Sequence, residues 1–235
     1  MDYNLNTLSQ YRVMQPGQPE IVRQRMYDYQ LYPTAGQAQL AFFQLPIGQG
    51  ASSALGAPVP SAKTYADTNM EIGGQLAKGK SFLAESIEVI FEPGAVATAG
   101  TFTPAKASLY AATIAADVMA LVTDANTFRV SGWLEFYILS KTYLWEAPLG
   151  AFPPKTRFEI DAAVALAGTA AAPVVQASSV GRAAGRAYYL DPPITLDSNT
   201  NFTIYLKWPG AVATPSGFNG RVGVVLDGVQ YRLSQ

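Results

Sequence analysis

The chain has 235 residues, of which 49% are hydrophobic, so it can bury a sizeable core and is not intrinsically disordered. It contains neither His nor Cys, which excludes a Ser-His-Asp triad, an HExxH zinc site, a thiolate nucleophile and disulfide bonds. The formal net charge of −1 gives no general attraction to nucleic acid or to anionic membranes.

Charged residues are scarce in this sequence. They make up 14% of the chain, against roughly a quarter in ordinary soluble domains. Because interface cores are depleted in charge, this composition favours a surface largely covered by partners; a simply neutral, Ala-rich protein is the alternative. Carboxylates, Lys and Tyr could still catalyse a reaction, but the missing His lowers the expectation of an enzyme.

Residues 1–36 are rich in Gln, Asn and Tyr, and they predict an extended N-terminal arm. Such an arm can lie along a neighbouring molecule, where assembly compensates its ordering entropy, and a frayed terminus is the alternative. The first residues, Met1–Asn4, lack the basic-then-apolar pattern of a signal peptide. No apolar run reaches the roughly 18 residues that a membrane span needs.

The first half of the remaining chain predicts two strands and one helix. Gln37–Leu45 alternates as a core strand and leads into an uncharged loop over Ile47–Pro60. Ser81–Glu92 is a strong strand with one slip in its alternation near Ser86. An apolar stripe predicts a helix over about 107–123.

The second half predicts strand after strand. The expected strands are Phe128–Leu139, Thr142–Trp145, Arg157–Ala165, Arg186–Leu190, Asn201–Trp208 and Arg221–Leu233. Asp227-Gly228 marks a hairpin or bulge in the last of them. The Ala-rich stretch Ala162–Ala172 is interpreted as a flexible loop. A long Ala/Gly loop is expected to follow the strand that ends at Ala165, through Gly185.

About eight short strands with turn signals between them predict an all-β fold. The specific expectation is an antiparallel β-sandwich, built as a single eight-stranded jelly roll with one inserted helix over about 107–123. In this interpretation residues 1–36 are the arm and residues 37–235 are the jelly-roll domain. No repeat with a period of 20–50 residues is present, which disfavours a propeller or a solenoid.

Two stretches carry a family resemblance. Asp67–Leu76 leading into the strand Ser81–Phe91, and the ending from Ile194–Leu196 through Arg221–Leu233, resemble the major capsid proteins of small tailless icosahedral bacteriophages. The likeness covers residues 37–235 and is one of pattern, without a catalytic signature. A double jelly roll of sixteen strands of about five residues would nearly exhaust the chain, so a single one is expected.

The resemblance implies a viral structural protein that is not an enzyme. It implies capsid subunits that assemble in the host cytoplasm into a closed shell, the virion capsid, around a genome bound without sequence specificity. The implied partners are copies of the chain itself and other capsid proteins, and an internal membrane is left open. No catalytic, cofactor-binding or metal-binding residues are expected.

One motif points elsewhere. Gly74–Ser81 matches the P-loop pattern GxxxxGK[ST], in which Lys80 would reach the β- and γ-phosphates and Ser81 would hold magnesium. Val118–Asp124 imitates the apolar run and Asp of its usual companion motif. A P-loop must follow a buried strand and open a helix, but here polar residues precede it and strand-forming residues follow. A P-loop NTPase is therefore a remote alternative.

Carboxylates and aromatic residues offer two further interpretations. Glu85, Glu88 and Glu92 could be paired acids for glycoside chemistry, but their spacing along one strand favours a solvated face. Four aromatic residues could stack on sugars, which makes a carbohydrate-binding jelly roll, lectin-like or a spike module, the main alternative to a capsid protein. These residues are Tyr143, Trp145, Tyr188 and Tyr189.

Overall fold

The computed structural model describes residues 20–54, 61–93, 114–155, 158–169, 172–183 and 187–232. Within these ranges the chain forms ten strands, one α-helix and one short 3-10 helix. The strands are β1 (Glu20–Tyr32), β2 (Gln39–Phe42), β3 (Lys80–Glu92), β4 (Trp133–Ile138), β5 (Lys141–Glu146), β6 (Phe158–Thr169), β7 (Ala172–Ala183), β8 (Tyr188–Leu196), β9 (Phe202–Lys207) and β10 (Gly220–Arg232). The helices are α2 (Ile114–Ser131) and η1 (Leu149–Ala151).

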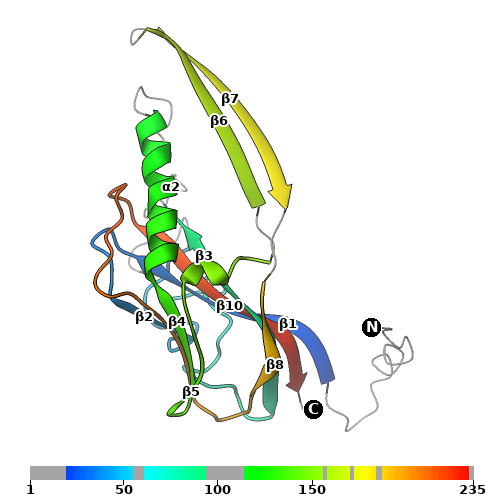
Figure 1. Ribbon diagram of the computed structural model, residues 1–235. Helices are drawn as coiled ribbons and strands as arrows, with labels where there is room; N and C mark the ends of the chain where they lie inside the picture. The colour runs from blue at the N-terminus through cyan, green and yellow to red at the C-terminus, as the bar shows by residue number, and fades with distance from the viewer. Residues whose placement is uncertain are drawn as a thin grey trace.

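In the described part of the chain, two antiparallel four-stranded sheets form the body of the molecule (Figure 1). Sheet A has the order β1-β10-β3-β8, and sheet B has the order β2-β9-β4-β5. A third sheet contains only the hairpin β6-β7. The all-β architecture predicted from the sequence is therefore confirmed, and the two four-stranded sheets are consistent with the predicted sandwich.

The strict alternation of apolar and polar side chains explains why segments such as β9 form strands with one buried face. In β9 the side chains of Phe202, Ile204 and Leu206 are buried, and the residues between them are partly exposed. Sheet A contributes its own buried set to the same hydrophobic core, including Phe82 and Leu226. The core between the sheets thus holds the apolar half of each alternating strand.

A bulge interrupts the long pairing of β3 with β10. Ser86 lies opposite Asp227 and Ala84 opposite Gly228, so that Glu85 is the extra residue. Gly228 is required there because a Cβ atom on it would lie 1.9 Å from the carbonyl oxygen of Leu83. The slip predicted near Ser86 and the bulge predicted at Asp227-Gly228 are therefore one confirmed feature.

The assignment of residues 20–32 to an N-terminal arm is wrong. These residues form β1, which pairs with β10 along its full length, from Glu20 opposite Arg232 to Tyr32 opposite Gly220. The strand escapes the sequence pattern because its buried positions hold Met26, Asp28 and Tyr32 in place of a run of aliphatic residues. Residues 1–19 lie outside the described residues.

The helix and the strand after it have different bounds from those predicted. Helix α2 continues past residue 123 to Ser131, and β4 begins only at Trp133, so Phe128–Ser131 is helical and not part of a strand. Tertiary packing explains the difference, because the buried ring of Phe128 packs into the core from the helix. The predicted start of the helix near residue 107 lies outside the described residues.

The loop predicted from the Ala/Gly-rich composition is also wrong. β6 extends to Thr169, and Ala172–Ala183 forms its partner β7, with Phe158 opposite Ala183 at one end of the hairpin. Ala and Gly have low intrinsic strand propensity, so composition alone hides a strand whose stabilisation comes from backbone pairing. β8 likewise runs through Pro192-Pro193, which an edge strand tolerates.

Four aromatic rings close one end of the core. Tyr32 of β1, Phe91 of β3, Phe128 of α2 and Trp208 just after β9 contact one another, and the rings of Phe91 and Phe128 stack at 4.2 Å. The indole N–H of Trp208 also donates to the backbone oxygen of Phe128 at 3.1 Å. Both sheets and the last turns of helix α2 are joined at this cluster.

A buried ion pair ties β1 to the loop after β2. The Nζ of Lys63 lies 2.5 Å from Asp28, and both side chains are fully buried. Asp28 also accepts the backbone N–H of Phe43 at 2.7 Å. Burial raises the pKa of Asp28, and the charge of Lys63 opposes that shift.

Replacing Lys63 with Met should destabilise the fold by about 3–5 kcal/mol, because it leaves the Asp28 carboxylate buried without its counter-charge. The double variant Asp28→Asn/Lys63→Met should recover most of that loss, since Asn can still accept from Phe43. Urea denaturation measures both effects. The control is Lys80→Met, which removes a more exposed pair with Glu71 and should cost less than about 1 kcal/mol. Equal losses for Lys63→Met and Lys80→Met would contradict this account.

Candidate functional site

The P-loop-like segment leads into a strand and not into a helix. Gly74 and Gly79 adopt left-handed backbone conformations, with φ of +71° and +80°, and β3 begins directly at Lys80. Asp124, the acid of the companion motif, lies in helix α2 and accepts the backbone N–H of Ser216 at 2.9 Å. The strand–loop–helix geometry that would hold nucleotide phosphates is therefore not formed by this segment.

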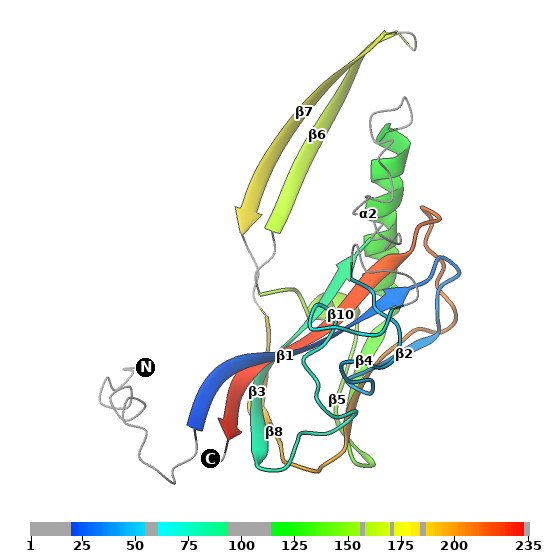
Figure 2. The ribbon, with the colours of Figure 1, turned by 180° about the vertical axis from the view of Figure 1, so that it is seen from behind.

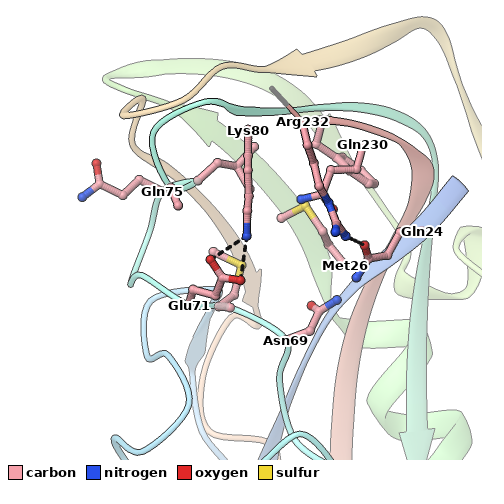
Figure 3. A pocket seen from close by; sticks show the side chains of 12 residues that line it. Gln24, Met26, Asn69, Glu71, Gln75, Lys80, Gln230 and Arg232 are labelled. Carbon is pink, nitrogen blue, oxygen red and sulfur yellow. Dashed lines mark hydrogen bonds and ion pairs between the residues drawn. The ribbon is translucent and has the colours of Figure 1, made fainter. Parts of the chain in front are cut away.

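A small pocket lies where Lys80 enters β3 (Figure 3). The ammonium group of Lys80 points at the carboxylate of Glu71, 2.6 Å away, and Arg232 donates to Gln24 and Gln230. The cavity of about 60 Å³ is large enough only for a few water molecules, well below the roughly 300 Å³ of a typical ligand pocket. Both cations already have partners, and the side chains that line the pocket connect β1, β3 and β10.

The three carboxylates of β3 are engaged in ion pairs across sheet A. Glu85 pairs with Arg23 at 3.0 Å, and Glu92 pairs with Arg221 at 3.5 Å. Glu88 is only 1% exposed, so the solvated face predicted for it is wrong.

Segment 152–155, which crosses sheet A after η1, buries Glu88. The backbone N–H of Lys155 donates to Glu88 at 2.7 Å, while the Nζ of Lys155 lies 2.5 Å from Asp227. A backbone bond from Val89 to the oxygen of Phe152, at 2.9 Å, holds the segment in register. Carboxylates bound in this way by cations and a backbone amide stabilise sheet A. They are not arranged as the free acid and base of a glycoside hydrolase.

Trp133, Glu135 and Tyr137 lie at alternate positions of β4, and the sequence analysis assigned them no role. In the structure Glu135 accepts the indole N–H of Trp133 at 2.8 Å, the hydroxyl of Tyr137 at 2.9 Å and the ammonium of Lys207 at 2.6 Å. Burial alone would raise the pKa of Glu135, but these donors outweigh it and hold the pKa below its ordinary value. The network fixes the ring of Trp133 on the outer face of sheet B.

The aromatic residues singled out from the sequence lie at one side of the sandwich. Trp145 is 74% exposed and, with the exposed Tyr143, lies on β5, the edge strand of sheet B. The exposed Tyr189 lies on β8, the edge strand of sheet A. We call Tyr143, Trp145 and Tyr189 the aromatic edge. Tyr188 is different, because it is half-buried and packs on Phe152.

The two edge strands are joined at this side of the molecule. The hydroxyl of Tyr188 in β8 donates to Glu146 in β5 at 3.4 Å, and residues of both strands line a hollow of about 560 Å³. A second, shallow hollow lies between Trp133 and Trp145. Both strands end their sheets within the described part of the chain, so each has a neighbouring strand on one side only there. This combination favours a surface that binds a partner.

No protein-family model, curated protein or solved structure matches the chain. Among the described residues, no group of three or more acidic side chains is placed to hold a metal ion. The described helices do not include one of the length and hydropathy that crossing a membrane requires. The aromatic edge is the strongest candidate functional surface because it combines exposed aromatic side chains with an edge strand of each sheet.

Replacing Glu135 with Gln should lower stability at pH 7 by about 1–2 kcal/mol, because it weakens the charge-assisted bonds from Lys207, Trp133 and Tyr137. The pKa of Glu135 is depressed in the folded state, so its contribution is complete above the ordinary value of 4.5 and is lost as pH falls through the lower folded value. The difference between variant and parent should therefore shrink below pH 4. Thermal unfolding between pH 3 and pH 7 measures it, with the exposed Glu71→Gln as control. A constant difference at every pH would refute this explanation.

Magnesium with ATP should leave the melting temperature unchanged, because Lys80 is already paired with Glu71 and no helix follows it. Differential scanning fluorimetry with the parent and Lys80→Ala tests this expectation. A stabilisation by nucleotide that disappears in Lys80→Ala would establish a phosphate site and overturn our interpretation.

Proposed function

We propose that the chain is a viral structural protein, a capsid subunit of a tailless icosahedral bacteriophage that assembles with copies of itself into a shell. The observation that carries the proposal is the aromatic edge, where Tyr143, Trp145 and Tyr189 are exposed on one edge strand of each sheet. An edge strand offers backbone groups with which another chain can pair. Exposed aromatic side chains are typical of a protein–protein interface.

The pairing order of the sheets supports a single jelly roll as the fold of this subunit. Without the hairpin β6-β7, the eight sheet strands pair first with last, second with seventh, third with sixth and fourth with fifth. These are the pairs of one long folded hairpin, and the further pairs β10-β3 and β9-β4 wrap it into two sheets. Such wrapping is typical of jelly rolls, which recur in viral capsids. Helix α2 is inserted between β3 and β4.

Assembly of the shell depends on repeating the same weak contacts between many identical subunits. A sandwich with open edges has several weak contact surfaces, and a closed symmetric shell multiplies each weak contact many times. In this proposal the partners are copies of the chain and other capsid proteins, and the location is the virion. The enclosed genome is bound without sequence specificity, and the net charge of −1 gives the chain no general attraction to nucleic acid. The subunit itself is not an enzyme.

A carbohydrate-binding jelly-roll module is the second candidate function. The shallow hollow between Trp133 and Trp145 also includes Glu146, and sugars are bound by aromatic faces with a nearby carboxylate to accept from hydroxyl groups. The ring of Trp133 is already fixed by Glu135, which favours rigid stacking. This function predicts a small oligomer that binds a glycan.

Size-exclusion chromatography with light scattering and electron microscopy should show species far above the 25.1 kDa monomer. Trp145→Lys should reduce them, because it places a charge in the contact. The matched control is Tyr65→Lys, since Tyr65 is similarly exposed, at 72%, and lies beside β1 at the opposite edge of sheet A.

A parent protein that stays strictly monomeric at high concentration, with no particles in the electron microscope, would contradict the capsid proposal. A glycan array then tests the second candidate. Binding by the parent that is lost in Trp145→Ala, while the molecular mass is unchanged, would favour the carbohydrate-binding module.

A further inference from the structure

The hollow between the edge strands β5 and β8 has the volume of a site for a small organic molecule. It is lined by Tyr143 and Leu144 of β5, by residues 188–195 of β8 and by Asp197, and we call it the edge hollow. Its volume of about 560 Å³ lies within the roughly 300–1,000 Å³ of ligand pockets. Both strands lie at the end of the sandwich away from helix α2 (Figure 2).

A wide bulge in β8 shapes the edge hollow. Tyr189 lies opposite Ser86 of β3, and five residues further on Ile194 lies opposite Ala84. Four residues of β8 therefore lie where β3 has a single one, and they are displaced from the ladder. Two of the four are Pro192-Pro193, which have no N–H to donate, so this stretch of β8 is poorly suited to pairing with a further strand. Bulges of this kind are frequent beside functional sites.

The charges in the edge hollow are all negative. Asp191 and Asp197 line it with exposed side chains, and no Lys or Arg belongs to the lining. Within the described part of the chain, neither carboxylate forms an ion pair. Glu146, which accepts the hydroxyl of Tyr188 at 3.4 Å, adds a third carboxylate beside the hollow. A concave surface with one sign of charge concentrates ligands of the opposite sign.

Three aromatic rings complete the lining of the edge hollow. They belong to Tyr143, Tyr188 and Tyr189. The face of an aromatic ring attracts a cation, and the Nζ of Lys141 lies 5.2 Å from the centroid of the Tyr143 ring. Lys141 itself does not line the hollow. Tyrosine rings beside carboxylates are the chemistry that binds organic ammonium ions.

The spacing of the two carboxylates indicates a ligand with more than one positive charge. Asp191 lies in the bulge beside Ala84–Ser86, and Asp197 follows Leu196, which lies opposite Phe82. Three to four residues of β3 separate these two positions, which corresponds to about 10–13 Å. A linear polyamine can reach both carboxylates at once.

We propose that the edge hollow binds a linear polyamine. Its ammonium groups pair with Asp191 and Asp197, and its alkyl chain packs on the tyrosine rings between them. This inference goes beyond the proposed function, because it assigns a small-molecule site to the subunit. It does not require that the subunit assembles.

The lining disfavours other classes of ligand. An anion such as phosphate would meet three carboxylates and no Lys or Arg. A sugar needs donors as well as acceptors, but the side chains of the lining donate only through the hydroxyls of the tyrosines and Thr195. A lysine side chain of a protein partner has one charge on a four-carbon stem, so it cannot pair with both carboxylates.

Isothermal titration calorimetry of the full-length parent with spermidine should show one saturable site per chain. Nα-acetyl-lysine amide has a single ammonium group and should bind about tenfold more weakly, because it leaves one carboxylate without a partner. Tetraethylene glycol, a neutral chain, should show no binding. Raising the salt concentration should weaken the binding of spermidine, since the site is exposed.

The double variant Asp191→Asn/Asp197→Asn should bind spermidine about tenfold more weakly than the parent, because both ion pairs are lost. The matched control is Glu20→Gln/Glu71→Gln, which removes the same number of charges away from the hollow and should bind like the parent. Tyr143→Leu keeps an apolar side chain but removes one ring, and should weaken binding about threefold. Far-UV circular dichroism checks that each variant folds.

The outcomes are independent of those that test the capsid proposal. If spermidine does not bind, or if the two double variants bind it equally, the polyamine site is wrong, whatever light scattering shows about assembly. Equal affinity for spermidine and Nα-acetyl-lysine amide would also overturn it, because a single charge would then suffice. Binding that depends on the charges of the ligand and on Asp191 and Asp197 supports the site, even in a protein that stays monomeric.

Discussion

Four aromatic rings at one end of the core hold sheet A, sheet B and helix α2 together, and the arrangement of the whole molecule depends on this contact. Tyr32 and Phe91 come from sheet A, Trp208 follows the last strand of sheet B, and Phe128 enters from helix α2. Aromatic contacts of this kind add about 0.5–1.5 kcal/mol each beyond burial of their area. The cluster thereby sets where helix α2 leaves the sandwich.

Several of the few charged residues of the chain are buried inside the fold. Asp28 and Lys63 are buried together, Glu88 and Asp227 lie under Lys155, and Glu135 gathers three donors on sheet B. Each of these groups fixes one segment against another. The charges committed to these internal ties are not free to keep copies of the molecule apart, while exposed aromatic side chains remain on β5 and β8.

Strand alternation in the sequence was sufficient to predict most of the two sheets. β9 has apolar residues at every second position, β3 does so apart from a slip at the bulge near Ser86, and β10 does so from Val222 to Leu226. β1 was missed because its buried positions include Asp28, whose partner Lys63 lies 35 residues away in the sequence. β7 was missed because Ala-rich sequence has no strand preference of its own.

The candidate site was predictable only in part. The exposure of Trp145 and Tyr189 depends on β5 and β8 being edge strands, which is a property of the sheet order and not of local sequence. Tyr188, beside Tyr189, lies on the opposite face of β8 and is half-buried against Phe152. Similarly, the burial of Glu88 depends on segment 152–155 crossing the sheet, which no spacing along β3 indicates.

The antiparallel pairing of β1 with β10 has a practical consequence for engineering. It brings Glu20, at the start of one strand, beside Arg232, at the close of the other, and both lie at the end of the sandwich away from helix α2 and the hairpin (Figures 1 and 2). Foreign peptides or fluorescent reporters joined beyond Arg232 would therefore emerge far from the helix and the hairpin. In an assembled particle, that geometry would present many copies of a fused cargo in one fixed orientation.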